Sequence, residues 1–98
     1  MAQFLALLKR DYDRFGEAAF TPELMEAEAQ RARQLYADGV NRMMWSRGDH
    51  PGAIVVMEGE SIEAVRANIE TLPLRKTEML VVEAIIPLAP YRGFGPRT

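Results

Sequence analysis

The chain has 98 residues, of which 48% are hydrophobic and 27% are charged, and this composition predicts one globular domain over residues 1–98. The net charge of −2 argues against nucleic acid or an acidic membrane surface as partners, and no apolar run is long enough to span a membrane. The sequence has no cysteine, which excludes disulfides and thiolate metal sites, and no signal-peptide pattern, so we expect a cytoplasmic protein.

Local patterns divide the chain into alternating strands and helices. Thr21 is a suitable helix cap, Pro22 suits a first helical position, and Gly39 suits the position after a last turn. The turn-rich residues 48–52 separate two strand-like runs. In chain order, the predicted elements are a strand at 4–8, a loop at 11–20, a helix from 22 to about 38, strands at 40–47 and 53–57, a helix from 61 to 72, a strand at 78–88 and an extended tail at 89–98.

This order, β-α-β-β-α-β, is typical of the ferredoxin-like fold, an α+β architecture in which two helices cover one face of an antiparallel sheet. Residues 53–57 are apolar on both faces of their strand, and so are residues 4–8. Because two helices cover only one face, we expect the other face to pack against a second copy in a homodimer, or in a larger assembly of dimers. The alternative is that the tail, residues 89–98, folds back over this face.

Glu28 is the strongest candidate for a catalytic residue. With about 100° per residue it falls roughly 40° from Leu24, inside the apolar stripe that also contains Ala32 and Leu35. A carboxylate on a buried helix face loses hydration, which raises its pKa and suits it to proton transfer near neutral pH. The alternative is structural, in which Glu28 pairs with an arginine and fixes the helix to the sheet.

Arg42 is the predicted partner of Glu28. Strict alternation along residues 40–47 places Arg42 and Met44 on one face and Trp45 on the other. A partly buried Arg42 could neutralise Glu28, or it could hold a substrate carboxylate through its bidentate fork. Trp45 could line a substrate pocket or, alternatively, belong to the core or to a dimer interface.

Two further side chains are candidates for substrate binding. His50, the single histidine, follows Asp49 in the predicted hairpin loop, where the two could form an acid–base pair or His50 could simply be exposed. Tyr36 lies on the apolar side of the first helix, where it could donate a hydrogen bond into a cavity or pack in the core. One histidine and no cysteine exclude a histidine-rich metal site within one chain.

Three features occur together in this sequence: Glu28 on the first helix, a Gly-x-x-Arg-x-x-Trp pattern that begins at Gly39, and a Leu-Pro-Leu run at 72–74 after the second helix. Over residues 22–88 this combination resembles the muconolactone Δ-isomerase family. The resemblance implies a dimeric α/β barrel that assembles into larger rings. It also implies a reaction without a cofactor, in which a proton moves on a small unsaturated lactone acid from aromatic breakdown.

The resemblance implies roles for individual side chains as well. Glu28 would be the acid–base, and Arg42 would hold the substrate carboxylate. Trp45 and Tyr36 would shape the wall of the cavity. The sequence departs from the family pattern at Ser46, where the family carries arginine. Two alternatives therefore stay open, a non-catalytic dimeric module that binds a small ligand and a cofactor-free monooxygenase of the same fold.

Overall fold

The computed structural model describes residues 1–93. Hydroxyl oxygens of Thr21 and Ser61 cap the two longer helices by accepting backbone N–H groups of their first turns at 3.2 Å and 3.1 Å. The first of these helices ends before Gly39, whose φ of 80° suits glycine, as the sequence predicts. In chain order, the elements are β1 (Ala2–Arg10), α1 (Tyr12–Phe15), the 3-10 helix η1 (Glu17–Ala19), α2 (Pro22–Ala37), β2 (Asn41–Ser46), β3 (Gly52–Gly59), α3 (Ile62–Ile69), α4 (Pro73–Lys76) and β4 (Leu80–Pro87).

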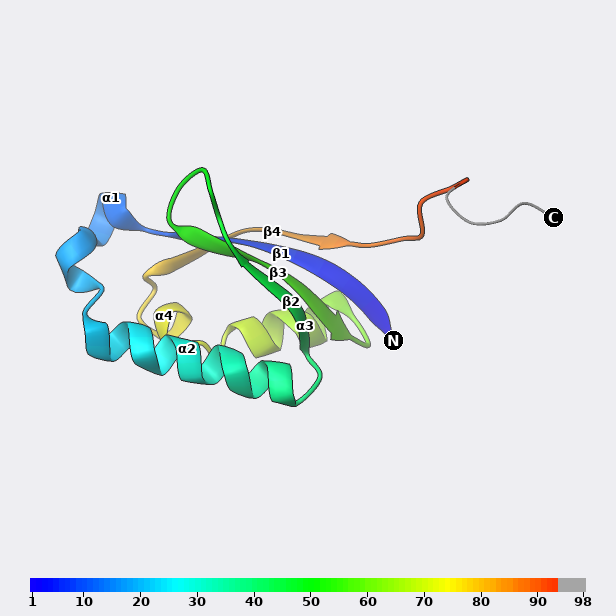
Figure 1. Ribbon diagram of the computed structural model, residues 1–98, viewed down its shortest axis with the longest axis horizontal. Helices are drawn as coiled ribbons and strands as arrows, with labels where there is room; N and C mark the ends of the chain where they lie inside the picture. The colour runs from blue at the N-terminus through cyan, green and yellow to red at the C-terminus, as the bar shows by residue number, and fades with distance from the viewer. Residues whose placement is uncertain (94–98) are drawn as a thin grey trace.

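The four strands form one sheet in the order β2-β3-β1-β4, and every neighbouring pair is antiparallel. Helices α2, α3 and α4 lie on one side of this sheet (Figure 1). The predicted α+β architecture, with β-α-β-β-α-β order, is therefore confirmed. Within residues 1–93, none of the helices combines the length and the apolar character that crossing a membrane requires.

The core lies between the sheet and the helices. Phe4, Ala6 and Leu8 alternate along β1 and are buried, and Leu35 of α2 and Ile69 of α3 pack in the same cluster. Burying side chains as large as leucine or isoleucine contributes roughly 1.5–3 kcal/mol each. This layer therefore fixes α2 against the sheet and determines which side of the helix faces inward.

Two predicted elements differ from the observed ones. Residues 11–20 are not a plain loop, because the carboxylate of Asp11 accepts the N–H of Arg14 at 3.1 Å and starts the short helix α1. The helix predicted to reach residue 72 ends at Ile69, and α4 then begins at Pro73. A proline has no N–H to donate, so it fits a new first turn better than the middle of a continuing helix.

An extra residue interrupts the ladder of β2. Asn41 and Met43 pair with consecutive residues of β3, so Arg42 has no opposite residue. This bulge places Asn41 and Met44 on the helix side of the sheet, where both line the same cavity. The prediction that Arg42 and Met44 share a face was wrong, because strict alternation does not hold across a bulge.

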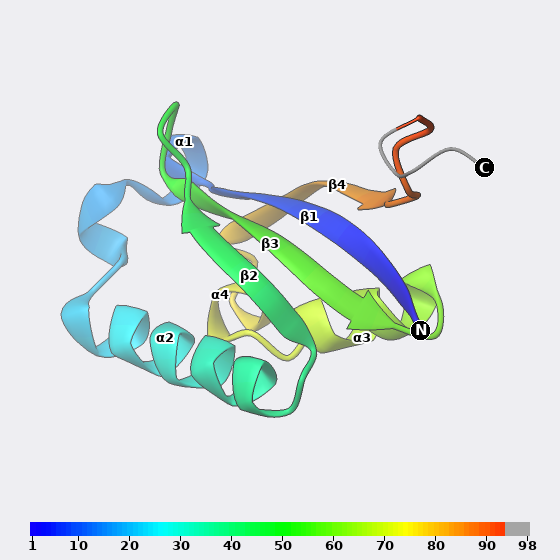
Figure 2. The ribbon, with the colours of Figure 1, turned by 45° about the vertical axis from the view of Figure 1, so that its right-hand side comes forward.

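The face of the sheet opposite the helices, here called the outer face, is apolar. Figure 2 shows α2, α3 and α4 on the other side of the sheet. Residues 89–93 are exposed and run beyond the end of the sheet (Figure 1), so this part of the tail does not fold back over it. Residues 94–98 lie outside the described part of the chain. Two rows of paired residues cross all four strands on the outer face, namely Met43, Val56, Leu5 and Ile86 in one and Trp45, Ile54, Leu7 and Ala84 in the other.

Candidate functional site

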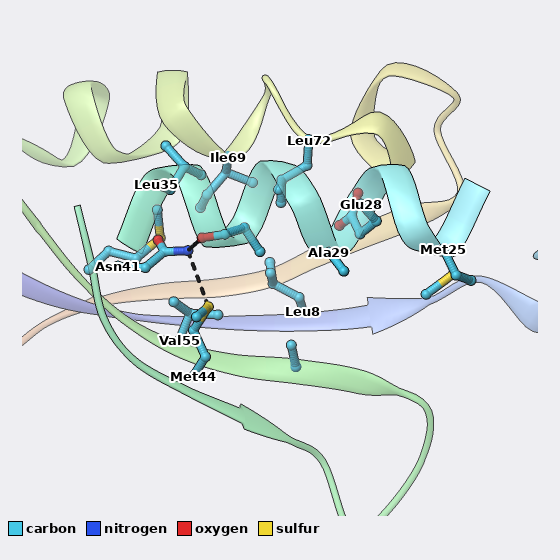
Figure 3. A pocket seen from close by; sticks show the side chains of 13 residues that line it. Leu8, Met25, Glu28, Ala29, Leu35, Asn41, Met44, Val55, Ile69 and Leu72 are labelled. Atoms are coloured by element: carbon cyan, nitrogen blue, oxygen red, sulfur yellow. Dashed lines mark hydrogen bonds between the residues drawn. The ribbon is translucent and has the colours of Figure 1, made fainter. Parts of the chain in front are cut away.

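A cavity of about 170 Å³ lies between α2 and the inner face of the sheet. Its wall is mostly apolar, with Leu8 and Val55 from the sheet and Ala29 from α2. Two polar side chains interrupt this wall, Glu28 and Asn41. Figure 3 shows them at opposite ends of the cavity, with the apolar side chains between them. This arrangement, an apolar chamber with few polar groups, is typical of a small-molecule site.

The inward face of α2 carries Glu28 into the cavity wall. Its Oε1 accepts the N–H of Leu74 at 3.0 Å, in the first turn of α4, where the cap residue Leu72 offers no side-chain acceptor. Burial raises the pKa of Glu28 and outweighs the hydrogen bond from Leu74 and the charge of Arg10, both of which lower it. Glu28 therefore exchanges protons closer to neutral pH than an exposed glutamate does.

Arg10 is the cation beside Glu28. A smaller cavity of about 130 Å³ shares Glu28 with the first and is also lined by Arg10 and Ser46. The guanidinium of Arg10 donates to the hydroxyl of Tyr12 at 3.2 Å and lies 5.9 Å from the ring centre of Phe20. No sequence pattern distinguishes Arg10, which lies two residues after the strand predicted at 4–8.

Asn41 is the second polar group of the cavity, and it is only 4% exposed. Its Nδ2 donates to the carbonyl oxygen of Ala32 at 3.4 Å and lies 3.4 Å from the sulfur of Met44. Its Oδ1 is buried and has no hydrogen-bond partner among residues 1–93. Strict alternation along residues 40–47 would put Asn41 on the same face as Trp45, and no residue type near it indicates the bulge that turns it inward.

Arg42 and Tyr36 lie away from the cavity. They share a surface depression at the end of α2 with Ala37, Gly39 and Asn41, and both are exposed. The predicted pairing of Arg42 with Glu28 was wrong, because Glu28 accepts the N–H of Leu74 and Arg42 lies in the depression at the end of α2. The predicted roles of Arg42 and Tyr36 in substrate binding therefore gain no support from this geometry.

Trp45 and His50 also lie outside the cavity wall. Trp45 is 63% exposed on the outer face. His50 lies beside Asp49, with 3.5 Å between its Nε2 and the carboxylate, and Arg47 donates to both side chains. Whether this pair exchanges protons stays a prediction. In the described part of the chain, no group of three or more histidine or carboxylate side chains is arranged to hold a metal ion.

The fold and the cavity together define a ferredoxin-like protein with a ligand-sized chamber between helix and sheet. No family model matches the sequence, and no curated protein matches it either. Among solved structures, muconolactone isomerase is similar with a TM-score of 0.76 and 20% identity, over 98% of this chain and 97% of that chain.

A second similar structure is 5-chloro-2-hydroxyhydroquinone dehydrochlorinase (TftG) from Burkholderia phenoliruptrix AC1100, solved in complex with 2,5-dihydroxybenzoquinone. Its TM-score is 0.64 and its identity 21%, over 93% of this chain and 95% of that chain. At sequence identities of 20% and 21%, these two similarities establish the fold of this chain alone. The chain therefore has the fold of muconolactone isomerase, as its sequence pattern predicts.

Proposed function

We propose that this protein is a cofactor-free isomerase that moves a proton on a small unsaturated lactone or acid from aromatic catabolism. The observation that carries the proposal is the position of Glu28, a carboxyl group with a raised pKa in the wall of an otherwise apolar cavity of ligand size. The fold shared with muconolactone isomerase supports the class of substrate.

The reaction needs one acid–base group. The carboxylate of Glu28 removes a proton from one ring carbon and returns it to another, so the double bond moves and Glu28 ends the cycle as it began it. Its Oε1 accepts the N–H of Leu74, which leaves Oε2 for the proton transfer. Arg10 lines the adjoining cavity, where its guanidinium can hold a substrate carboxylate or stabilise negative charge that develops on the ring.

The same proposal includes a homodimer formed through the outer face. The two apolar rows are bounded by polar groups on both sides, by the hydrogen-bonded pair Gln3 and Glu58 at one end and by Lys9, Arg47 and Glu83 at the other. An apolar patch with a polar rim is typical of a protein interface. In a two-fold symmetric dimer, the apolar patch of one copy packs against the same patch of the other, so no different partner is needed.

Proton NMR of muconolactone in D₂O tests the function. We expect the wild-type protein to exchange ring protons for deuterium, and Glu28→Gln to abolish this exchange while the fold is kept, because glutamine can still accept the N–H of Leu74. Glu23→Gln, on the exposed start of the same helix, is the matched control and should exchange like the wild type.

Exchange that persists in Glu28→Gln would remove Glu28 from the mechanism. No exchange in any of the folded proteins would exclude muconolactone as substrate. That result would favour a ligand-binding module, in which the one role of Glu28 is to accept the N–H of Leu74 at the start of α4.

A further inference from the structure

We propose that Tyr12 is a positioning residue that, together with the ring of Phe20, holds the guanidinium of Arg10 in place for the carboxylate of a ring ligand. The inference rests on the proposed function only in taking the two adjoining cavities as the ligand site. It adds two residues that the proton transfer does not involve, both from the segment 11–20 that links β1 to α2 (Figure 1).

Arg10 ends β1 with part of its guanidinium unpaired. Leu8, two residues earlier on the same face of β1, is buried, and both residues line the smaller cavity. The Nη1 of Arg10 donates to Tyr12, whereas its Nε and Nη2 have no acceptor in the described part of the chain. Arg47 pairs with two carboxylates, but no carboxylate of the described residues pairs with Arg10. The Nε–Nη2 edge of Arg10 therefore remains for the two oxygens of a carboxylate.

Two aromatic side chains hold this cation from the two ends of the segment 11–20. The hydroxyl of Tyr12 accepts from Nη1 of Arg10 at 3.2 Å, and the Cζ atom of Arg10 lies over the ring of Phe20, 5.9 Å from its centre. The two rings also contact each other, with their centres 4.9 Å apart and a tilt of 57°. An arginine side chain loses much rotamer freedom when a ligand fixes it, so holding it beforehand lowers the cost of binding.

The two cavities together fit a single ring that carries one anionic group. The larger one, of about 170 Å³, is mostly apolar and close to the roughly 150 Å³ of an engineered apolar cavity that binds benzene. The smaller one, of about 130 Å³, adjoins it at Glu28 and has Arg10 in its wall. A ring in the larger cavity would place a carboxylate in the smaller one, where the loss of hydration requires an opposite charge.

Benzoate and benzamide are the probes, because they have one ring and nearly the same shape but differ in charge. Their affinities are measured at neutral pH by NMR titration for the wild type and three variants. Arg10→Met removes the charge, whereas Tyr12→Phe removes only the hydroxyl group and keeps the ring beside Phe20. Tyr36→Phe makes the same change at an exposed tyrosine outside the lining of both cavities and is the matched control.

We expect the benzoate-to-benzamide affinity ratio to fall roughly tenfold or more in Arg10→Met, as the loss of a charged hydrogen bond predicts. The ratio should fall roughly threefold in Tyr12→Phe, where the cation is present but less firmly held, and stay unchanged in Tyr36→Phe. The affinity for benzamide should be the same in all four proteins. A merely structural role of Tyr12 would instead lower the affinities for both probes together.

An unchanged ratio in Tyr12→Phe or in Arg10→Met, or a wild type that does not bind benzoate, would overturn the proposal. For the case in which Tyr12→Phe does not fold, Phe20→Leu removes the ring beside the guanidinium and should lower the ratio for the same reason. The ratio needs no turnover. Failure of the isomerase test would therefore be seen in the deuterium exchange, and failure of this positioning role in the binding ratio.

Discussion

Glu28 is held between an apolar cavity and a backbone N–H group, and these surroundings favour opposite protonation states. The N–H of Leu74 favours the carboxylate, whereas burial beside side chains such as Ala29 favours the acid. The net effect is a raised pKa, so burial dominates. The same side chain therefore weakens the fold when it ionises and supplies a base where a ligand would bind.

The free energy of unfolding should therefore depend on the protonation state of Glu28. Folding raises the pKa of Glu28 above its ordinary value of 4.5, so its contribution to stability is fully present below pH 4.5 and is lost as the pH rises through the raised pKa. Glu28→Gln cannot ionise and keeps an acceptor for Leu74. We expect this variant to have the higher free energy of unfolding near neutral pH, and the difference from the wild type to shrink toward pH 4.5. Urea unfolding across this range measures it, and a difference that grows on acidification would contradict the explanation.

Part of the site could be predicted from residue spacing, and part could not. The helical period placed Glu28 in the apolar stripe of α2, because every residue of a regular helix advances by the same angle. The strand period failed at Arg42, because a bulge adds one residue without changing the composition of the strand. Asn41 therefore lines the cavity where Arg42 was expected, and Arg10, the last residue of β1, lines the adjoining cavity with Glu28 instead.

At the scale of elements, Arg47 fixes the hairpin between β2 and β3. Its side chain is only 7% exposed, and its guanidinium donates to Asp49 at 2.7 Å, to Glu83 of β4 and to the carbonyl oxygen of Leu8. These contacts hold the pKa of Asp49 well below its usual range and lower the pKa of Glu83. The loop is therefore tied to β1 and β4 across the end of the sheet.

Acid unfolding should depend on this cluster. The lowered pKa values give stability that is present above the ordinary values of 3.8 for Asp49 and 4.5 for Glu83 and is lost as the pH falls through the lowered ones. We expect Arg47→Met to be less stable than the wild type at neutral pH and to lose less further stability on acidification. Urea midpoints measured against pH test this, with Arg33→Met as control, because Arg33 belongs to an exposed ion pair with Glu26. Parallel pH profiles for wild type and Arg47→Met would refute the role of the cluster.

The major elements could be predicted from the sequence because each carries its own signals. The cap at Thr21 and the glycine at position 39 bound α2, and both act within one turn of the helix. The short helices α1 and α4 could not be predicted in this way. Each has four residues, fewer than a periodic pattern needs, and in the first turn of α4 the N–H of Leu74 donates to Glu28, which is distant in sequence.

At the scale of the whole molecule, the outer face should decide the oligomeric state. Trp45 stands at the β2 end of an apolar row and is 63% exposed, so Trp45→Asp would place a charge within the proposed interface. We expect the wild type to sediment as a dimer and Trp45→Asp as a folded monomer in analytical ultracentrifugation. Tyr36→Asp, a change at an exposed aromatic residue on α2, is the control and should remain dimeric. A monomeric wild type, or a dimeric Trp45→Asp, would exclude the outer face as the interface.

Because of the bulge at Arg42, the number of residues in β2 can change without a change in its pairing with β3. Because Asn41 and Met43 already pair with consecutive residues of β3, the ladder is complete without Arg42. Deletion of Arg42 would leave Asn41 and Met44 facing the cavity and Trp45 on the outer face. Deletion of Met44 would instead turn the side chains on one side of it to the opposite face of the sheet. Position 42 is therefore the place where β2 can lose a residue while the cavity and the outer face each keep their own side chains.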